Sequence, residues 1–147
     1  MLPVSVLIRN RPKPYLLDAD LSVTRAAIFL RDYHIGGAPV IRDGQLVGFA
    51  SERDIVFRVV AENKNPETTK ICDIMSTVVT TATVLATVEE CEHKMRDAHV
   101  RHLPILDKGV IVACISLRDV LQSELSQAEV EARCLSEYVR GTSADET

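Results

Sequence analysis

Two short segments combine residue types that can bind a phosphorylated or hydroxylated ligand. Residues 51–54 read SERD, and residues 116–119 read SLRD. Each places a hydroxyl, a guanidinium and a carboxylate at an expected helix start. Free backbone N–H groups there attract anions, and a carboxylate one turn further in can accept hydrogen bonds from a ribose diol. The plainer interpretation is a helix cap, but a cap gives no reason for the arginine to repeat.

The two segments belong to a longer internal repeat. Residues 21–56 and 86–121 align without a gap at an offset of 65, and ten of the 36 pairs are identical, whereas chance pairing would give about two. Each copy reads as β-α-β-β-α. A sheet this small cannot cover its own apolar face, so we expect two copies to pack face to face about a pseudo-two-fold axis, with clefts between them. The fold class is α/β (α+β).

Local signals place the elements within each copy. Short extended pieces are expected at 15–17 and 78–80. Helices then begin at Ser22 and at Thr87, the latter with a capping box to Glu90. Glycines in the turns at 43–44 and 108–109 predict hairpins, and the serines of the two four-residue segments begin the second helices.

These patterns divide the chain into five parts. We expect a first repeat at 3–62, a linker at 63–70, a second repeat at 71–125, a separate C-terminal helix at 127–140 that Gly141 ends, and a flexible tail at 141–147.

Composition excludes several functions. A formal net charge of −4 and few aromatic residues (4%) argue against nucleic-acid binding. The longest apolar run, at 110–115, has six residues, which predicts no membrane span. With no basic and apolar leader at the start, we expect a cytoplasmic protein whose four cysteines are reduced and mostly buried.

Metal and enzyme chemistry find little support in the sequence. Cys91, His93, His99 and His102 match no zinc spacing. Neither a nucleophile elbow nor a glycine-rich phosphate loop is present. We therefore expect no catalytic residue, no metal site and no required cofactor.

The motifs together resemble a tandem pair of CBS domains, the Bateman module. The resemblance covers about 3–125 and is carried by 34–40 (HIGGAPV), 46–48 (LVG), 51–56, 73–75 (DIM), 100–105 and 116–121. Residues 129–141 are similar to the end of small stand-alone bacterial CBS-pair proteins. The resemblance implies a regulatory module, not an enzyme, that binds an adenosine-containing ligand between its copies and signals to an effector protein. The ligands it implies are AMP, ADP, ATP, NAD and S-adenosylmethionine, with AMP, ATP or NAD favoured.

The resemblance also implies roles for particular residues. Asp54 and Asp119 would hold ribose, and the motif serines would approach ribose or phosphate. Each cleft would borrow the first strand of the other copy, and cationic residues would face phosphates. The ligand-binding residues expected are Tyr15, Ser51, Arg53, Asp54, Val79, Thr80, Arg101, His102, Ser116 and Asp119, with Leu16 beside Tyr15.

Three residues depart from the family pattern around Asp119. Ala113, where the family usually has glycine, and Cys114 after it add side chain that would crowd the base, and Tyr15 would either stack on adenine or plug the cleft. The alternative function is a structural dimerisation module that has lost its ligand. Under either function the resemblance implies a homodimer formed through helices, and we expect the apolar faces Val23/Ala27/Leu30 and Ile55/Val59 to form its interface, with 127–140 adding to it.

Overall fold

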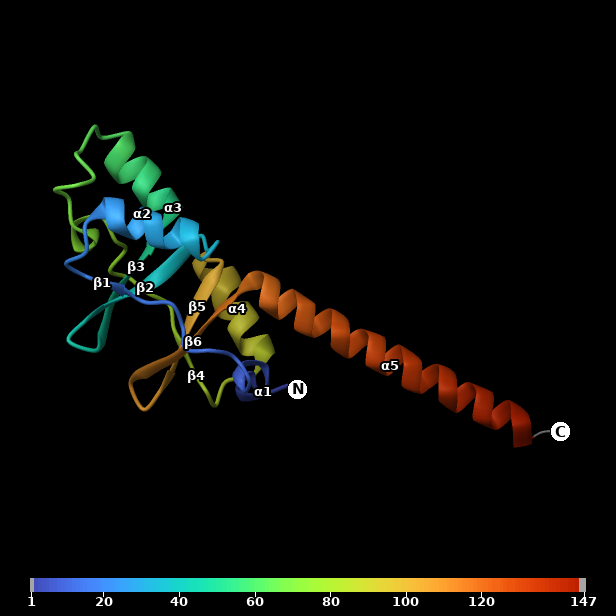
Figure 1. Cartoon of the computed structure of the whole chain (residues 1–147). Coiled ribbons are helices and arrows are strands. Elements are labelled where there is room, and N and C mark those ends of the chain that lie inside the picture. The colour runs from blue at the N-terminus through green and yellow to red at the C-terminus, as the bar shows by residue number, and fades with distance from the viewer. Residues whose placement is uncertain (1, 146–147) are drawn as a thin grey trace.

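The structure, a computed structural model, describes residues 2–145, with the side chains of the last helix described as far as Gly141. Two three-stranded sheets lie at its centre, each with a parallel first pair and an antiparallel second pair (Figure 1). The expected β-α-β-β-α order is confirmed in both copies. The first consists of β1 (Leu17–Asp18), α2 (Val23–Asp32), β2 (Gly37–Arg42), β3 (Gln45–Ser51) and α3 (Glu52–Ile55), which continues as a π-helical turn, η1 (Val56–Val60). The second consists of β4 (Ala82–Thr83), α4 (Val88–Ala98), β5 (His102–Asp107), β6 (Val110–Ser116) and α5 (Leu117–Asp145).

The expected helix starts and hairpin turns are present in the structure. The Ser22 side chain accepts a hydrogen bond from the Arg25 amide, and Thr87 and Glu90 form a reciprocal capping box. Gly44 and Gly109 have φ values of 77° and 81° in the two-residue hairpin turns, where glycine adopts positive φ without a steric penalty. The first strands begin later than expected, at 17 and 82 instead of 15 and 78.

The repeated histidines have a structural role at helix ends. His34 and His99 both have φ of 54°, and their amides donate to the carbonyls of Arg31 and Arg96. Histidine adopts the left-handed region more readily than most residues with a side chain. The repetition of these histidines is therefore explained by the end of α2 and of α4.

Each repeat has its own core, and each core is completed by a segment that precedes the other repeat. The first core includes Ile71 and Ile74 from the short helix η2 (Ile71–Asp73) and its end, and the Ile71 amide donates to the Leu21 carbonyl at 2.8 Å. The second core includes Val4 from α1 (Val4–Ile8). The expected repeat boundaries, 3–62 and 71–125, therefore do not coincide with the cores.

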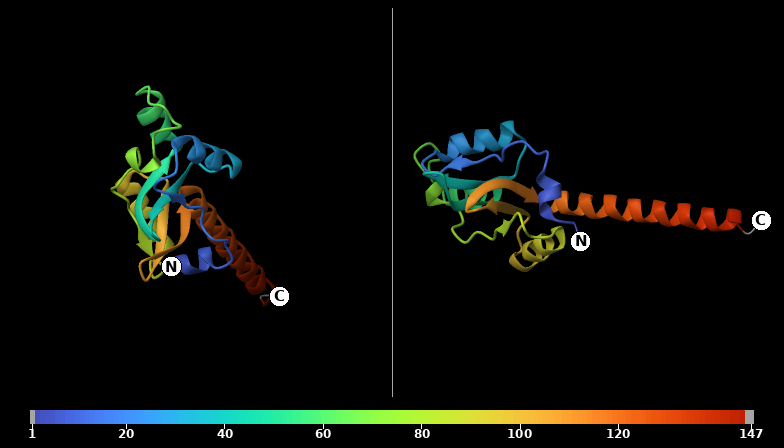
Figure 2. Two further views of the ribbon diagram at one scale, coloured as in Figure 1. Left: turned by 60° about the vertical axis from the view of Figure 1, so that its left-hand side comes forward. Right: turned by 90° about the horizontal axis from the view of Figure 1, so that it is seen from below.

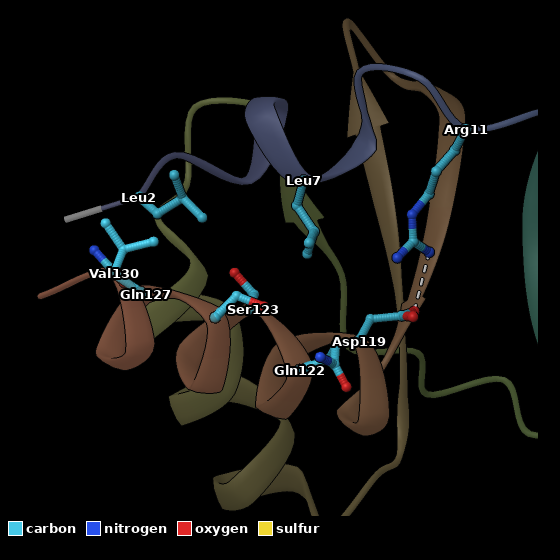
Figure 3. A pocket seen from close by; sticks show the side chains of 9 residues that line it. Leu2, Leu7, Arg11, Asp119, Gln122, Ser123, Gln127 and Val130 are labelled. Carbon is cyan, nitrogen blue, oxygen red and sulfur yellow. Dashed lines mark hydrogen bonds and ion pairs between the residues drawn. The ribbon is translucent and has the colours of Figure 1, made fainter. Parts of the chain in front are cut away.

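Helix α1 was not expected from the sequence. It packs against α4, and a cavity of about 460 Å³ separates it from the beginning of α5. Figure 3 shows Leu2 and Leu7 on the α1 side of this cavity, with Gln122, Ser123, Gln127 and Val130 on α5 opposite. We refer to it as the α1–α5 cavity.

The expectation of a separate helix at 127–140, ended by Gly141, is wrong. Helix α5 runs without a break from Leu117 to Asp145 and projects away from the two sheets (Figure 2). Its residues from 125 to 141 are exposed. No proline interrupts it, and one glycine costs a helix only about 1 kcal/mol relative to alanine. The expected flexible tail, 141–147, is thus helical as far as Asp145, and residues 146 and 147 lie outside the described part of the chain.

Two further expectations concern burial and membranes. All four cysteines are free thiols, but only Cys91 is buried, and Cys134 is exposed on the projecting part of α5. The expectation of mostly buried thiols is therefore wrong. Among residues 2–145, no helix combines the length and the apolar character needed to cross a bilayer.

Candidate ligand-binding clefts

Two clefts of ligand size lie between the repeats, one at each Ser-x-x-Asp motif. The first cleft, of about 540 Å³, is lined by Gly36, Phe49, Ser51, Glu52, Arg53, Asp54, Ser76, Val78, Val79, Thr80, His99, Val100, Arg101 and His102. The second, of about 500 Å³, is lined by residues 11–15, His34, Ile35, Gly36, Gly37, Pro39, His102, Ala113, Cys114, Ser116 and Asp119. These volumes are typical of small-molecule pockets.

The structure brings the expected site residues together in two groups. Seven of the ten line the first cleft: Ser51, Arg53, Asp54, Val79, Thr80, Arg101 and His102. Tyr15, Ser116 and Asp119 line the second cleft, where His102 also reaches. Leu16, expected beside Tyr15, is not among the residues that line either cleft.

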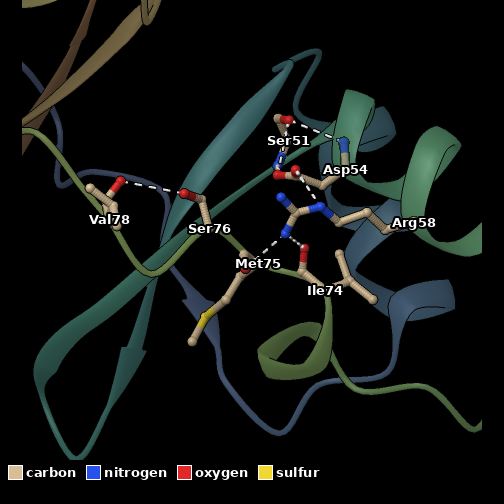
Figure 4. A network of polar contacts seen from close by, with 7 residues as sticks. All are labelled: Ser51, Asp54, Arg58, Ile74, Met75, Ser76 and Val78. Atoms are coloured by element: carbon tan, nitrogen blue, oxygen red, sulfur yellow. Dashed lines mark hydrogen bonds and ion pairs between the residues drawn. The ribbon is translucent and has the colours of Figure 1, made fainter. Parts of the chain in front are cut away.

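Asp54 lies in the first turn of helix α3, where it caps the helix start, and also faces the first cleft. Its Oδ2 accepts hydrogen bonds from the Ser51 amide at 2.9 Å and the Ser51 hydroxyl at 3.1 Å (Figure 4). Its Oδ1 lies 3.8 Å from Nε of Arg58, whose guanidinium donates to the carbonyls of Ile74 and Met75. The side chain is 17% exposed. The cap interpretation is therefore correct for Oδ2, and Oδ1 is the oxygen with capacity for a ligand hydroxyl.

Asp119 is engaged differently. Its Oδ2 accepts from the Ser116 amide at 2.8 Å and from Nη1 of Arg11 at 3.0 Å (Figure 3). Burial acts to raise the pKa of this carboxyl, but the hydrogen bonds and charge from Arg11 and Ser116 outweigh burial and hold the pKa below its usual value. Asp119 is therefore ionised and already paired with a cation from a distant segment.

Arg11 is a site residue that the sequence reasoning missed. The repeat offset of 65 aligns Arg11 with Ser76 and aligns Arg58 with Ser123. The second copy thus has no arginine one turn after its motif aspartate. Serine at position 123, in place of arginine, indicates that a cation for Asp119 must come from elsewhere in the chain.

His102 stands between the clefts and is stacked on an aromatic ring. Its imidazole lies 5.5 Å from the Phe49 ring, with 28° between the planes. Burial lowers the pKa of His102, and the negative charges of Asp119 and Glu52 offset that lowering only in part. His102 is therefore neutral at pH 7. Phe49 was not among the expected site residues, because apolar positions in strands are most often core.

Three other side chains near the clefts are held by their neighbours. The Arg53 guanidinium lies 5.1 Å from the centre of the Phe57 ring. Tyr15 packs against Tyr33, with ring centres 4.5 Å apart. Burial raises the pKa of the Cys114 thiol to about 12, so this thiol remains protonated.

Among the residues that the structure describes, no three His, Cys, Asp or Glu side chains are grouped as a metal site would require.

The fold and its clefts define a duplicated α+β module with two ligand-sized cavities between its repeats. The sequence model of the CBS domain matches residues 7–61 and 71–126. The chain belongs to the CBS domain family and contains two such domains.

Known relatives resemble the chain over most of its length. The protein YlbB of Bacillus subtilis is 31% identical over 140 residues, which cover 89% of this chain and 93% of YlbB. Matches to plant proteins such as CBSCBSPB3 of Arabidopsis thaliana cover only about a quarter of those longer proteins (23%).

Solved structures show the same fold. The CBS domain structure NE2398 superposes with a TM-score of 0.80 at 28% identity, covering 85% of this chain and 99% of that one. The CBS domain pair of MJ0100, solved in complex with 5′-methylthioadenosine and S-adenosyl-L-methionine, has a TM-score of 0.74 at 25% identity. That match covers 86% of this chain and 98% of MJ0100.

Proposed function

We propose that this protein is a regulatory module, without catalytic activity of its own, that binds an adenosine-containing nucleotide in the first cleft. The observation that carries the proposal is the gathering of Asp54, Thr80 and Arg101 from three separate segments around one cavity. The complex of the MJ0100 pair with two adenosine compounds supports the ligand class.

The first cleft offers a partner for each part of such a ligand. Asp54 Oδ1 accepts a ribose hydroxyl, because Oδ2 already serves the helix start. Val78 and Val79 offer an apolar surface and backbone groups to an adenine base. Arg53 and Arg101 lie at the same cavity, and guanidinium groups form strong, often bidentate bonds to phosphate. AMP, ADP, ATP, NAD and S-adenosylmethionine share the adenosine part, and phosphates distinguish the first four.

The signalling form is proposed to be a homodimer that acts on an effector protein. Three residues of the expected dimer faces, Val23, Leu30 and Val59, are buried within the chain and are not available to a partner. The exposed apolar residues are instead Val56 and Val60 of η1 and the equivalent Leu121 and Leu125 of α5. These four side chains repeat at the offset of 65, so a second copy placed on the pseudo-two-fold axis would cover both pairs together. A change in either cleft would then reach the partner subunit through helices that begin at Ser51 and Ser116.

A purely structural dimerisation module is the second candidate. It is favoured by the pairing of Asp119 with Arg11, because this carboxylate has a partner without any ligand. The regulatory candidate requires that the purified protein bind an adenosine compound, and the structural candidate requires that it bind none.

The test is to identify and measure the ligand. Small molecules released from purified, heat-treated protein are analysed by mass spectrometry, and AMP is then titrated into ligand-free protein by calorimetry. We expect an adenosine compound in the first measurement and saturable binding in the second. If neither is found with the protein folded, the structural candidate replaces the regulatory one.

A further inference from the structure

The two clefts supply a cation to their motif aspartate in opposite ways. In the first, Arg58 comes from the same helix as Asp54, is held by two backbone carbonyls, and is not among the residues that line the cavity. In the second, Arg11 comes from a segment 108 residues away and lines both the second cleft and the α1–α5 cavity. Arg58 thus lies outside the first cleft, whereas Arg11 lines the second cleft.

The two repeats also differ by one methyl group next to these segments. In the first repeat, Phe49 and Ser76 exchange two backbone hydrogen bonds of 2.9 Å, and a Cβ at Gly48 would lie 2.4 Å from the Met75 sulfur and 2.7 Å from the Ser76 carbonyl oxygen. The second repeat has Ala113 at the position of Gly48. The isolated bridges between the described residues include Phe49 with Ser76 but none between Cys114 and residue 11.

The segment at 11–14 is also unsuited to the backbone pairing that Ser76 makes. The amide of Arg11, the residue equivalent to Ser76, already donates to the Ile8 carbonyl at 3.1 Å, and Ala113 adds a side chain where Gly48 allows close backbone approach. Arg11 therefore contacts the second repeat through its side chain, and the salt bridge to Asp119 is the result. The side chains of the pair are 32% and 28% exposed, so solvent and ligand can reach both.

This salt bridge competes with a ribose for the same carboxylate. Oδ2 of Asp119 already accepts two donors, from the Ser116 amide and Arg11. A single hydroxyl can bond Oδ1 of Asp119 without moving Arg11, as proposed for Oδ1 of Asp54, whereas a diol that bonds both carboxylate oxygens must displace Arg11 and leave its guanidinium without a counterion. A ligand phosphate in the same cleft would receive that guanidinium, and Lys13 lines the cleft beside it. A ligand without a phosphate would give Arg11 no new partner.

We propose that Arg11 is the specificity-determining residue of the second cleft, which it closes to uncharged nucleosides and opens to nucleotides that carry a phosphate. This proposal rests on the function proposed above. Arg11 moves from Asp119 to the incoming phosphate, so the ribose takes the carboxylate and the phosphate takes the guanidinium in one exchange.

The experiment uses an Asp54→Asn background, which weakens the first cleft so that the second cleft contributes more of the measured binding. AMP and adenosine are titrated by calorimetry into this protein and into the same protein carrying Arg11→Ala, Arg11→Gln or the control Arg9→Ala. Arg9 lies two residues away and lines neither the clefts nor the α1–α5 cavity. We expect Arg11→Ala to reduce the ratio of AMP affinity to adenosine affinity at least about tenfold, equivalent to roughly 1.4 kcal/mol. Arg11→Gln retains a donor for Asp119 without the charge, and we expect it to shift the ratio in the same direction.

A ligand-free measurement accompanies the titrations. Hydrogen exchange over residues 9–16 should be faster in Arg11→Ala than in Arg9→Ala if the salt bridge holds this segment. Unchanged exchange, an unchanged affinity ratio, an equal change in the Arg9→Ala control, or no binding of either probe in any variant would each overturn the proposal. AMP binding by the parent protein with an unchanged ratio in Arg11→Ala would reject this proposal and leave the proposed function standing. A parent protein that binds no adenosine compound would reject both.

Discussion

Replacing Asp54 with asparagine separates its role in the helix from its role in the first cleft. The substituted side chain would keep the size and one acceptor oxygen of the native one, so the Ser51 amide retains a partner. The lost charge at the helix start costs about 0.3–1 kcal/mol. The lost ion pair with Arg58 adds little, because the atoms are 3.8 Å apart and Arg58 is 54% exposed. For a chain of this size we expect Tm to fall by no more than about 4 °C.

The expected effect on ligand binding is larger. A ribose hydroxyl that loses its charged acceptor loses roughly 1.5–3 kcal/mol, so we expect AMP affinity at the first cleft to fall at least about tenfold. Calorimetric titration of AMP and thermal melting followed by circular dichroism measure the two effects on the same samples.

Matched controls make the result specific to the cleft. Asp97→Asn removes one carboxylate from an exposed position of α4 and should leave AMP affinity unchanged. Asp119→Asn should reduce total AMP binding less than Asp54→Asn, because ribose reaches Asp119 only after the salt bridge to Arg11 has been broken. If Asp54→Asn folds and binds AMP as tightly as the parent, Asp54 is only a helix cap and the ribose assignment is refuted.

Three further predictions address assembly, packing and pH. Light scattering at micromolar concentration should show a dimer for the parent protein and a monomer for the double variant Val60→Glu, Leu125→Glu, since each buried glutamate would lack a partner; a parent monomer would contradict the proposed interface. Gly48→Ala should lower stability by about 1–3 kcal/mol in urea unfolding, because the added methyl meets Met75 and the backbone of residue 76, and a neutral result would show that this approach is loose. Burial lowers the pKa of His102 in the ligand-free protein and a bound phosphate would raise it, so AMP affinity should rise on acidification and still be rising below about pH 6.5, where an ordinary histidine titrates. His102→Gln should abolish that part of the gain, and a gain that is complete by about pH 6.5 would contradict the lowered pKa.

The repeat and both motif aspartates could be predicted from sequence, because pattern and spacing decide them locally. The offset of 65 relates Ser51 to Ser116 and Asp54 to Asp119, and both pairs form the capping hydrogen bonds expected at a helix start. The positions of Val79 and Thr80 at the first cleft followed only from the family resemblance. The periodicity of apolar residues does not show which repeat a first strand will pack beside.

The features that were missed depend on contacts between distant segments. Helix α1 is five residues long and is stabilised by burial of Val4 in the second core, a contact that no local signal encodes. Arg11 donates a hydrogen bond to Asp119, which is 108 residues away in the sequence. The unbroken course of α5 was not predicted for another reason: a glycine such as Gly141 commonly ends a helix, but one glycine does not forbid it.

The exchange of segments between the two cores has a consequence for how this fold could have arisen. A chain with one repeat, preceded by its own short segment, would have to insert that segment into the core of another molecule. Two such chains that kept this exchange would form an intertwined dimer, and joining them end to end would turn its intermolecular contacts into intramolecular ones. In the present chain the same exchange prevents either half from completing its core alone. Unfolding should therefore occur in one cooperative transition, although the chain contains two CBS domains.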